Sequence, residues 1–135
     1  MLAEAVLFGV FGLGLETVFT AALDWRKDPK RHLLGYSSLW YLPLYALAPL
    51  ILQHAGPFLF PLALPVRGLI YMLAFWTLEY PGMLALRLLL GTSPSEESYY
   101  KCRWNVHGLI RLDFAPAGFS LGLILEGLFR FIRHI

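Results

Sequence analysis

Three glutamates lie inside stretches that are otherwise apolar, and they are the residues with the clearest chemical potential. Glu16, Glu79 and Glu126 each fall near the middle of a different hydrophobic run. A charged group at the centre of a bilayer costs on the order of 3 kcal/mol, so an ionisable residue there marks a functional-site hypothesis. The sequence therefore predicts a polar intramembrane site that binds a cation, relays protons or holds a polar head group. Asp113, near the start of the last run, is a further candidate.

Small residues indicate which way two of these acids point. Four glycines lie at helical spacing from them: Gly9 and Gly12 before Glu16, and Gly118 and Gly122 before Glu126. Residues three or four apart share a helix face, and small residues on such a face let membrane helices approach closely. We therefore expect these two acids on helix-packing faces. Glu79 lies among bulky residues and should enter the protein from another side.

The acids have an alternative, structural interpretation. Glu126 and Arg130 have the spacing and order of a favourable helix ion pair, and buried polar groups can fix the register of helices. Glu16 could pair with Arg67 or with a tyrosine hydroxyl. The candidate partners of the acids are Arg67, Tyr45, Tyr80, Arg111 and Arg130.

Composition shows what must position these residues. Of 135 residues, 58% are hydrophobic and 15% are charged, and the mean hydropathy is +0.60. Small soluble domains bury only roughly 60–70% of the surface that their unfolded chains expose, which leaves no place for so much apolar surface. The composition excludes an ordinary cytosolic domain, a disordered tail and a fibrous repeat. It predicts an integral membrane protein.

The hydrophobic runs predict an all-α polytopic membrane protein. We expect a bundle of about four transmembrane helices in a single domain, 1–135, with helices at 2–23, 33–53, 66–90 and 114–132. The run 33–53 is long enough to cross a core of ~30 Å. The proline-rich stretch 54–65 is too short to span, so we expect an interfacial loop there. Pro81-Gly82 predicts a kink in the third helix, and 91–103 a polar loop.

Lysines and arginines predict the orientation. The first loop carries Arg26, Lys27, Lys30 and Arg31, and the third carries Lys101 and Arg103, whereas the second holds only Arg67. Loops rich in Lys and Arg stay in the cytoplasm. We therefore expect a multi-pass protein of the cell membrane with both termini outside, although Arg130 and Arg133 oppose this orientation.

Several kinds of site are not expected. The four histidines show no metal-ligand spacing, and the single cysteine, Cys102, allows no disulfide within the chain. The net charge of +2 is too small for a nucleic-acid partner, and no P-loop motif is present. No metal, cofactor or catalytic residue is assigned, because the sequence carries no catalytic motif and no ATPase motif.

Several segments resemble a known family when taken together. These are Leu-Glu-Thr-Val at 15–18, Leu-Pro-Leu-Tyr-Ala at 42–46, Leu-Glu-Tyr at 78–80 with Gly82, Gly-Leu-Ile-Arg-Leu at 108–112 after Trp104, and Glu126. In this order they resemble the bacterial ABC transporter type IV permease family, which is related to the eukaryotic transmembrane protein 229 family. The family usually has Trp-Asp-Tyr-Ser after its third helix, whereas this chain has Trp-Asn-Val-His at 104–107, so roles of that Asp and Tyr do not transfer.

The resemblance implies a transport-related subunit with four membrane helices. Four helices are few for a complete permease, so we expect a homo-oligomer or a partner membrane subunit, with an ATPase on a separate chain if the system is of ABC type. Membrane lipid is the other expected partner. Two alternatives stay open: a structural or assembly subunit, and an intramembrane enzyme acting on lipid, with Arg67, Arg87 or Arg111 holding a phosphate.

Overall fold

The computed structural model describes residues 1–28, 30, 32–94 and 96–134. Arg31, part of the predicted basic first loop, lies outside the described residues. The chain is 77% helical with almost no sheet, which confirms the predicted all-α class. In the described part of the chain, four helical stretches are long and apolar enough to cross a membrane: Leu2–Lys27, Leu39–Leu59, Leu64–Leu90 and Leu112–Arg133. These stretches are compatible with the predicted integral membrane protein.

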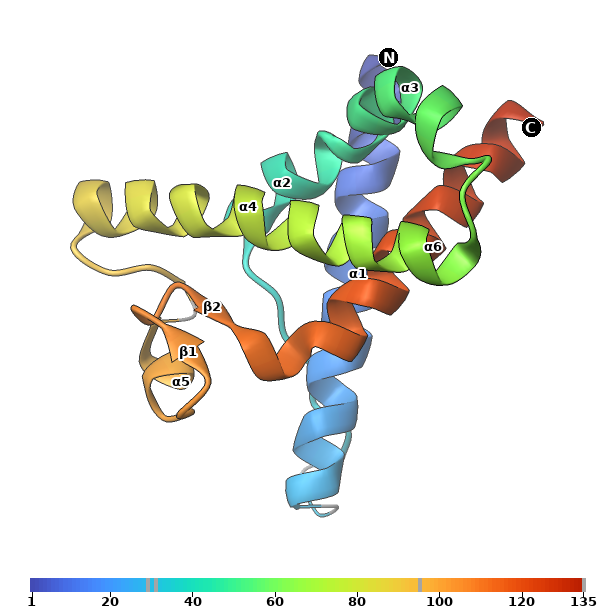
Figure 1. Cartoon of the computed structure of the whole chain (residues 1–135). Coiled ribbons are helices and arrows are strands. Elements are labelled where there is room, and N and C mark those ends of the chain that lie inside the picture. Colours follow the sequence, from blue (N-terminus) through green and yellow to red (C-terminus); the bar gives the residue numbers. More distant parts are fainter. Residues whose placement is uncertain (29, 31, 95, 135) are drawn as a thin grey trace. The chain divides into compact units, whose positions relative to one another are not determined.

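The helices and strands follow one another in the order shown in Figure 1. They are α1 (Leu2–Lys27), a 3₁₀ helix (Leu39–Tyr41), α2 (Leu42–Ala46), α3 (Ala48–Leu59), α4 (Leu64–Leu90), α5 (Glu96–Tyr100), β1 (Asn105–Val106), β2 (Ile110–Arg111), a second 3₁₀ helix (Leu112–Phe114) and α6 (Ala115–Arg133). The two short strands pair antiparallel, Asn105 opposite Arg111. The chain divides into two compact units, Met1–His54 and Ala55–Ile135.

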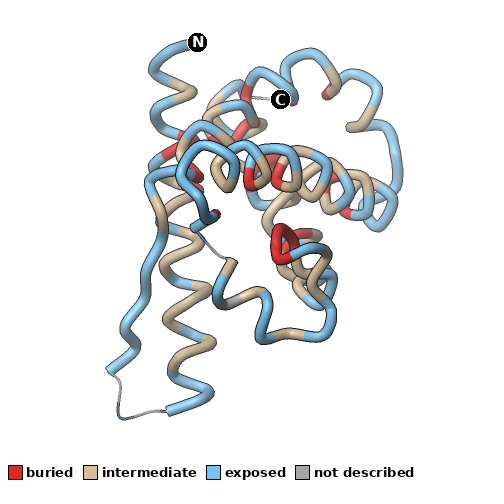
Figure 2. The backbone as a smooth tube through the Cα atoms, turned by 90° about the vertical axis from the view of Figure 1, so that its left-hand side faces the viewer, coloured by how far each residue is buried: buried red, intermediate tan, exposed pale blue. Residues whose placement is uncertain are grey.

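In the first unit, α2 packs against α1. Gly9 faces Leu42 and Gly12 faces the ring of Tyr45, so the glycine face of α1 is the face that receives α2. An extended segment, residues 34–38, connects the first loop to the 3₁₀ helix. Figure 2 shows this segment as an exposed stretch that runs beside α1.

In the second unit, α6 crosses the N-terminal half of α4. Gly122 lies against Tyr71, and a Cβ atom on Gly118 would lie 3.5 Å from Met72. The glycines of α6 therefore let the two backbones approach closely at this crossing. The connection between α4 and α6 contains α5 and the β-hairpin, and it folds back beside the C-terminal half of α4 (Figure 1).

The second helical stretch differs from the expected 33–53. Ser38 accepts a hydrogen bond from the backbone N–H of Trp40 through its side chain, so helical structure starts only after this cap. Pro43 occupies the first turn of α2 and Pro49 the first turn of α3. Proline is favoured in a first turn because it lacks an N–H that would stay unpaired there. The prolines thus divide the stretch into two helices.

Two other segments also differ from the expectations. The helix α3 continues to Leu59 and α4 begins at Leu64, so most of the expected interfacial loop 54–65 is helical. The stretch 91–103 was expected as a plain polar loop but contains α5. The helix α4 includes Pro81 and Gly82 and continues without interruption to Leu90. It ends at Gly91, whose φ of 85° is a left-handed conformation that glycine adopts without strain.

The α4–α6 crossing generates a stability prediction. We expect Gly122→Leu to lower the unfolding free energy in detergent by about 1–3 kcal/mol, because the new side chain meets Tyr71 and forces the helices apart. Gly127→Leu is the matched control, since a Cβ on this α6 residue would have no atom within 4 Å. Thermal unfolding of both variants tests the prediction, and equal stabilities would show that the crossing does not require glycine.

Candidate functional site

The carboxylate of Glu126 forms the densest polar cluster among the described residues of α4 and α6. Its side chain is only 4% exposed. Arg67 Nε and the Tyr71 hydroxyl both donate to Oε2, at 3.0 and 2.6 Å, and Arg130 Nη1 donates to Oε1 at 3.3 Å. Two guanidinium groups around one carboxylate give the cluster a net positive charge. We call these four residues the Glu126 cluster.

Helical spacing and a close helix crossing assemble the Glu126 cluster. Arg67 and Tyr71 are one turn apart on α4, and Glu126 and Arg130 are one turn apart on α6. Gly122, one turn before Glu126, admits Tyr71 to the surface of α6. Arg67 Nη1 also donates to the carbonyl oxygens of Phe60 and Leu62 at 3.3 and 2.6 Å. The cluster therefore fixes the turn between α3 and α4 as well as the helix crossing.

Glu79 forms a second polar centre on α4. It is 3% exposed and lies two residues from the middle of the helix. The hydroxyl of Tyr99 donates to Glu79 Oε1 at 3.1 Å. Tyr99 belongs to α5, so the connection between α4 and α6 supplies a partner to an acid in the middle of a candidate membrane span. The next residue, Tyr80, bonds to His107 Nδ1 at 2.7 Å, which ties the hairpin to the same level of α4.

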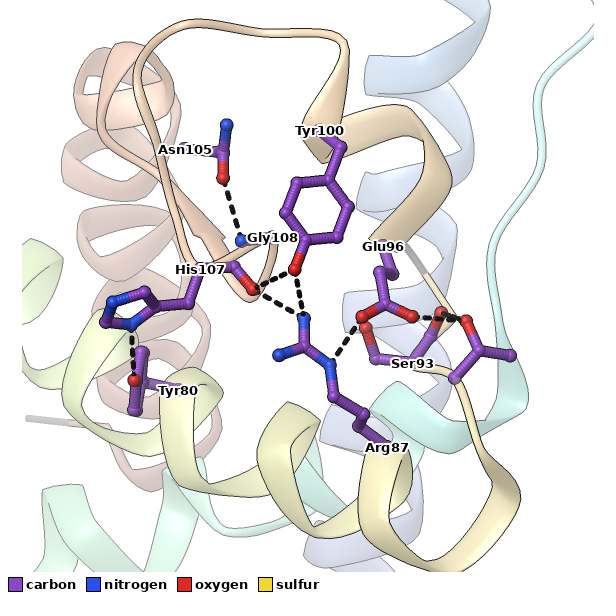
Figure 3. Close-up of polar contacts among 9 residues, drawn as sticks. Tyr80, Arg87, Ser93, Glu96, Tyr100, Asn105, His107 and Gly108 are labelled. Atoms are coloured by element: carbon purple, nitrogen blue, oxygen red, sulfur yellow. Dashed lines mark hydrogen bonds and ion pairs between the residues drawn. The ribbon is translucent and has the colours of Figure 1, made fainter.

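Arg87 anchors the connection to the last turns of α4 (Figure 3). Its guanidinium forms an ion pair with Glu96 and donates to the backbone oxygen of His107 at 2.5 Å. The Tyr100 hydroxyl donates to the same oxygen at 3.0 Å. His107 has a φ of 55°, a left-handed conformation that is uncommon outside glycine, and these bonds hold the turn in which it lies. Arg87 thereby positions the loop that carries Tyr99.

Glu16 has its partners within the first unit. The Ser37 hydroxyl donates to Glu16 Oε2 at 2.7 Å, and the Tyr45 hydroxyl also interacts with this carboxylate. Thr20, one turn further along α1, bonds to the backbone of Tyr36. Glu16 therefore faces both α2 and the extended segment 34–38.

Arg111 and Asp113 pair with each other. Arg111 Nε and Nη2 donate to the two carboxylate oxygens of Asp113 at 3.0 and 2.5 Å, a bidentate geometry that favours both charged forms. The Arg111 guanidinium also lies over the ring of Phe114, 3.9 Å from its centroid. The Arg111–Asp113 pair therefore stabilises the chain where it enters α6, and Asp113 has a structural role there.

The structure separates two of the acids that the sequence placed in one hypothetical site. Tyr71, which binds Glu126, precedes Glu79 by eight positions, or ~12 Å along α4. Arg67, considered as a partner for Glu16, pairs with Glu126 instead. In the described part of the chain, no group of three or more His, Cys, Asp or Glu residues could hold a metal ion.

Sequence reasoning named Tyr45, which interacts with Glu16, among the candidate partners, but it did not identify Ser37, Tyr71 or Tyr99 as hydroxyl donors. Tyr71 follows Arg67 at helical spacing, a signal that could have placed both on one face. Ser37 lies in Gly-Tyr-Ser-Ser at 35–38, a polar group before an apolar run that marks a helix start. Tyr99 gives no such signal, because a loop residue has no periodicity that indicates where it will reach.

The chain matches no known protein-family model, no curated protein sequence and no solved structure.

The Glu126 cluster generates a prediction about buried charge. Arg67→Met should lower the unfolding free energy by about 3–5 kcal/mol, because it leaves a buried carboxylate short of its closest cation. The double variant Arg67→Met with Glu126→Leu should recover most of this loss, since it removes the carboxylate as well. Arg133→Met is the control, because it removes an arginine of α6 that lies over the Phe129 ring and is not part of the Glu126 cluster. Chemical unfolding in detergent measures all three, and a loss in the double variant as large as in Arg67→Met would contradict the assignment.

The ion pair of Arg87 generates a prediction about pH. The Thr92 hydroxyl, followed by Arg87, lowers the pKa of Glu96 below its ordinary value. A lowered pKa in the folded state contributes stability above the unfolded-state pKa, and this contribution disappears as the pH falls through the folded-state value. We expect wild type to melt at a higher temperature than Glu96→Gln at neutral pH, and the difference to vanish in acid. Glu97→Gln, which changes an exposed neighbour, should melt as wild type throughout.

Proposed function

We propose that this chain is a membrane subunit of a permease-type transport system, and that Glu79 with Tyr99 is the polar site that the transported species reaches. The observation that carries the proposal is a buried carboxylate in the middle of α4 with a hydroxyl partner from the adjoining loop. An intramembrane ionisable residue is a functional-site hypothesis by default. The resemblance of four segments and of Glu126 to ABC transporter type IV permeases supports the same assignment.

The dimensions of α4 support a deep position for Glu79. Arg67 and Arg87 are 20 residues apart, or ~30 Å along a helix, which equals the thickness of a bilayer core. Long arginine side chains reach the interface from such positions. Glu79 then lies ~12 Å inside the level of Arg87. Tyr99 and His107 reach Glu79 and its neighbour Tyr80, so polar groups of the loop continue inward from the membrane edge.

The chemistry of this centre fits a cation or a proton. A carboxylate that accepts a hydrogen bond from a phenol, as Glu79 does from Tyr99, can exchange that bond for a cation or accept a proton. Transport of this type needs more helices than four. We therefore propose a homo-oligomer or a partner membrane subunit in the cell membrane, with an ATPase on a separate chain and both termini outside.

The Glu126 cluster favours a second, structural function for its own residues. Two arginines and a tyrosine bind the carboxylate, and Arg67 also binds two carbonyl oxygens of the preceding turn. Such a network fixes the register of α4 and α6. A structural or assembly subunit would need this cluster but would not need an ionised Glu79.

Glu79→Gln separates transport from assembly because it keeps the shape of the side chain and removes its charge. We expect the tagged full-length chain to co-purify from its native membranes with vanadate-sensitive ATP hydrolysis. In Glu79→Gln the complex should form to the same extent, while its ATP hydrolysis and the growth of the complemented deletion strain should both fall, because the charge in the middle of the span is lost.

Glu97→Gln is the matched control, because it neutralises an exposed acid of the neighbouring loop, and it should behave as wild type. Full activity of Glu79→Gln would overturn the proposed site. A complex without ATP hydrolysis would overturn the ABC-type assignment and leave the assembly function.

A further inference from the structure

The extended segment 34–38 follows the surface of α1 at close range. The hydroxyl of Thr20 accepts from the backbone N–H of Tyr36 and lies 2.8 Å from the backbone oxygen of the same residue. Gly35 permits this approach, because a Cβ there would collide with the Thr17 carbonyl oxygen. At its far end the segment brings the Ser37 hydroxyl to Glu16. Extended backbone thus runs along α1 from the loop to the carboxylate.

The position of Glu16 on α1 shows how deep this segment reaches. The charged end of α1 begins at Asp24, after the apolar run that ends at Leu23. Glu16 lies seven residues inside Leu23, or ~10 Å along the helix axis. Because Ser37 contacts Glu16, the extended chain descends to about the same depth. It does so beside a helix that is long and apolar enough to cross a membrane.

Hydrocarbon cannot surround an extended backbone at that depth. Tyr36 has both backbone groups bonded to Thr20, but those of Gly35 and Ser37 make no hydrogen bond to any described residue. Residues 34–37 are exposed, Tyr36 by 63%. Non-helical backbone inside a membrane is tolerated only where protein covers it or where it lines a water-filled space. The neighbouring side chains of Glu16, Thr17, Thr20 and Ser37 are all polar, which favours water.

We infer that segment 34–38 and the facing side of α1 line a water-filled vestibule through which small cations reach Glu16. Its lining offers hydroxyl, carbonyl and carboxylate oxygens, which are ligands for hard cations. The first loop at its mouth is basic, but charges there are screened over a Debye length of about 8 Å at physiological salt. Glu16 lies deeper than this screening length, so its negative charge determines the electrostatic potential inside the vestibule. The existence of the vestibule does not depend on the proposed transport function. Only the fate of the cation after it reaches Glu16 rests on that function.

Cysteine accessibility tests the vestibule in membrane vesicles whose orientation presents the first loop to the reagent. Cys102 is the only cysteine, so Cys102→Ser provides a cysteine-free background. We expect Ser37→Cys and Tyr36→Cys in that background to react with a membrane-impermeant trimethylammonioethyl methanethiosulfonate nearly as fast as Lys30→Cys in the loop. Tyr36→Cys leaves the Ser37–Glu16 bond in place. Val18→Cys is the control at equal depth: it is 69% exposed on the opposite face of α1 and should react about tenfold more slowly or less, as expected of a lipid-facing site.

The charge of the reagent tests the ligand class. The cationic reagent should modify Tyr36→Cys several times faster than the anionic sulfonatoethyl reagent, and adding Glu16→Gln should abolish this preference. Reaction rates at 36 and 37 as low as at 18 would overturn the vestibule. Fast reaction with no effect of Glu16→Gln would overturn its assignment to cations. Neither measurement involves ATP hydrolysis or transport, so a functional Glu79→Gln would leave the vestibule standing.

Discussion

Hydrocarbon forms no hydrogen bonds, and this constraint governs the polar residues of the chain. Each acid of the apolar helices has a donor: Ser37 for Glu16, Tyr99 for Glu79, and Tyr71 with two arginines for Glu126. The same constraint explains why Arg67 also binds the carbonyls of the turn before α4, which have no helical partner. Where the protein leaves backbone groups unbonded, as at Gly35 and Ser37, water is the remaining partner.

Glycines make these pairings possible because they decide where helices and chain segments meet. Tyr71 reaches Glu126 only because Gly122 leaves space beside it, and residues 34–38 reach Glu16 only because Gly35 can lie against Thr17. A larger side chain at either glycine would shift a backbone and lengthen the hydrogen bonds to Glu126 or Glu16, whose strength depends on distances of a fraction of an ångström. Packing and electrostatics are therefore coupled at these two places.

The four apolar helices and the glycine faces could be predicted because each depends on local composition or on helical periodicity. The late start of the second helical stretch could not, because an uncharged run of 21 residues satisfies the length criterion, while the start depends on a single cap, Ser38. The partner of Glu79 also escaped prediction. Tyr99 is brought to Glu79 by the contacts that Arg87 makes with Glu96 and His107, and pairing across a folded connection leaves no periodic signal in sequence.

The different surroundings of Glu79 and Glu126 bear directly on function. In the Glu126 cluster, two guanidinium groups and a phenol hold one buried carboxylate. Removing any one of these partners would leave buried charge poorly compensated, so the arrangement suits a structural element. At Glu79 one donor is the neutral hydroxyl of Tyr99 on a separate element, and a single hydrogen bond of this kind breaks at modest cost. A site that must bind and release a charged species needs such a reversible partner, and for this reason the transport hypothesis is better placed at Glu79 than at Glu126.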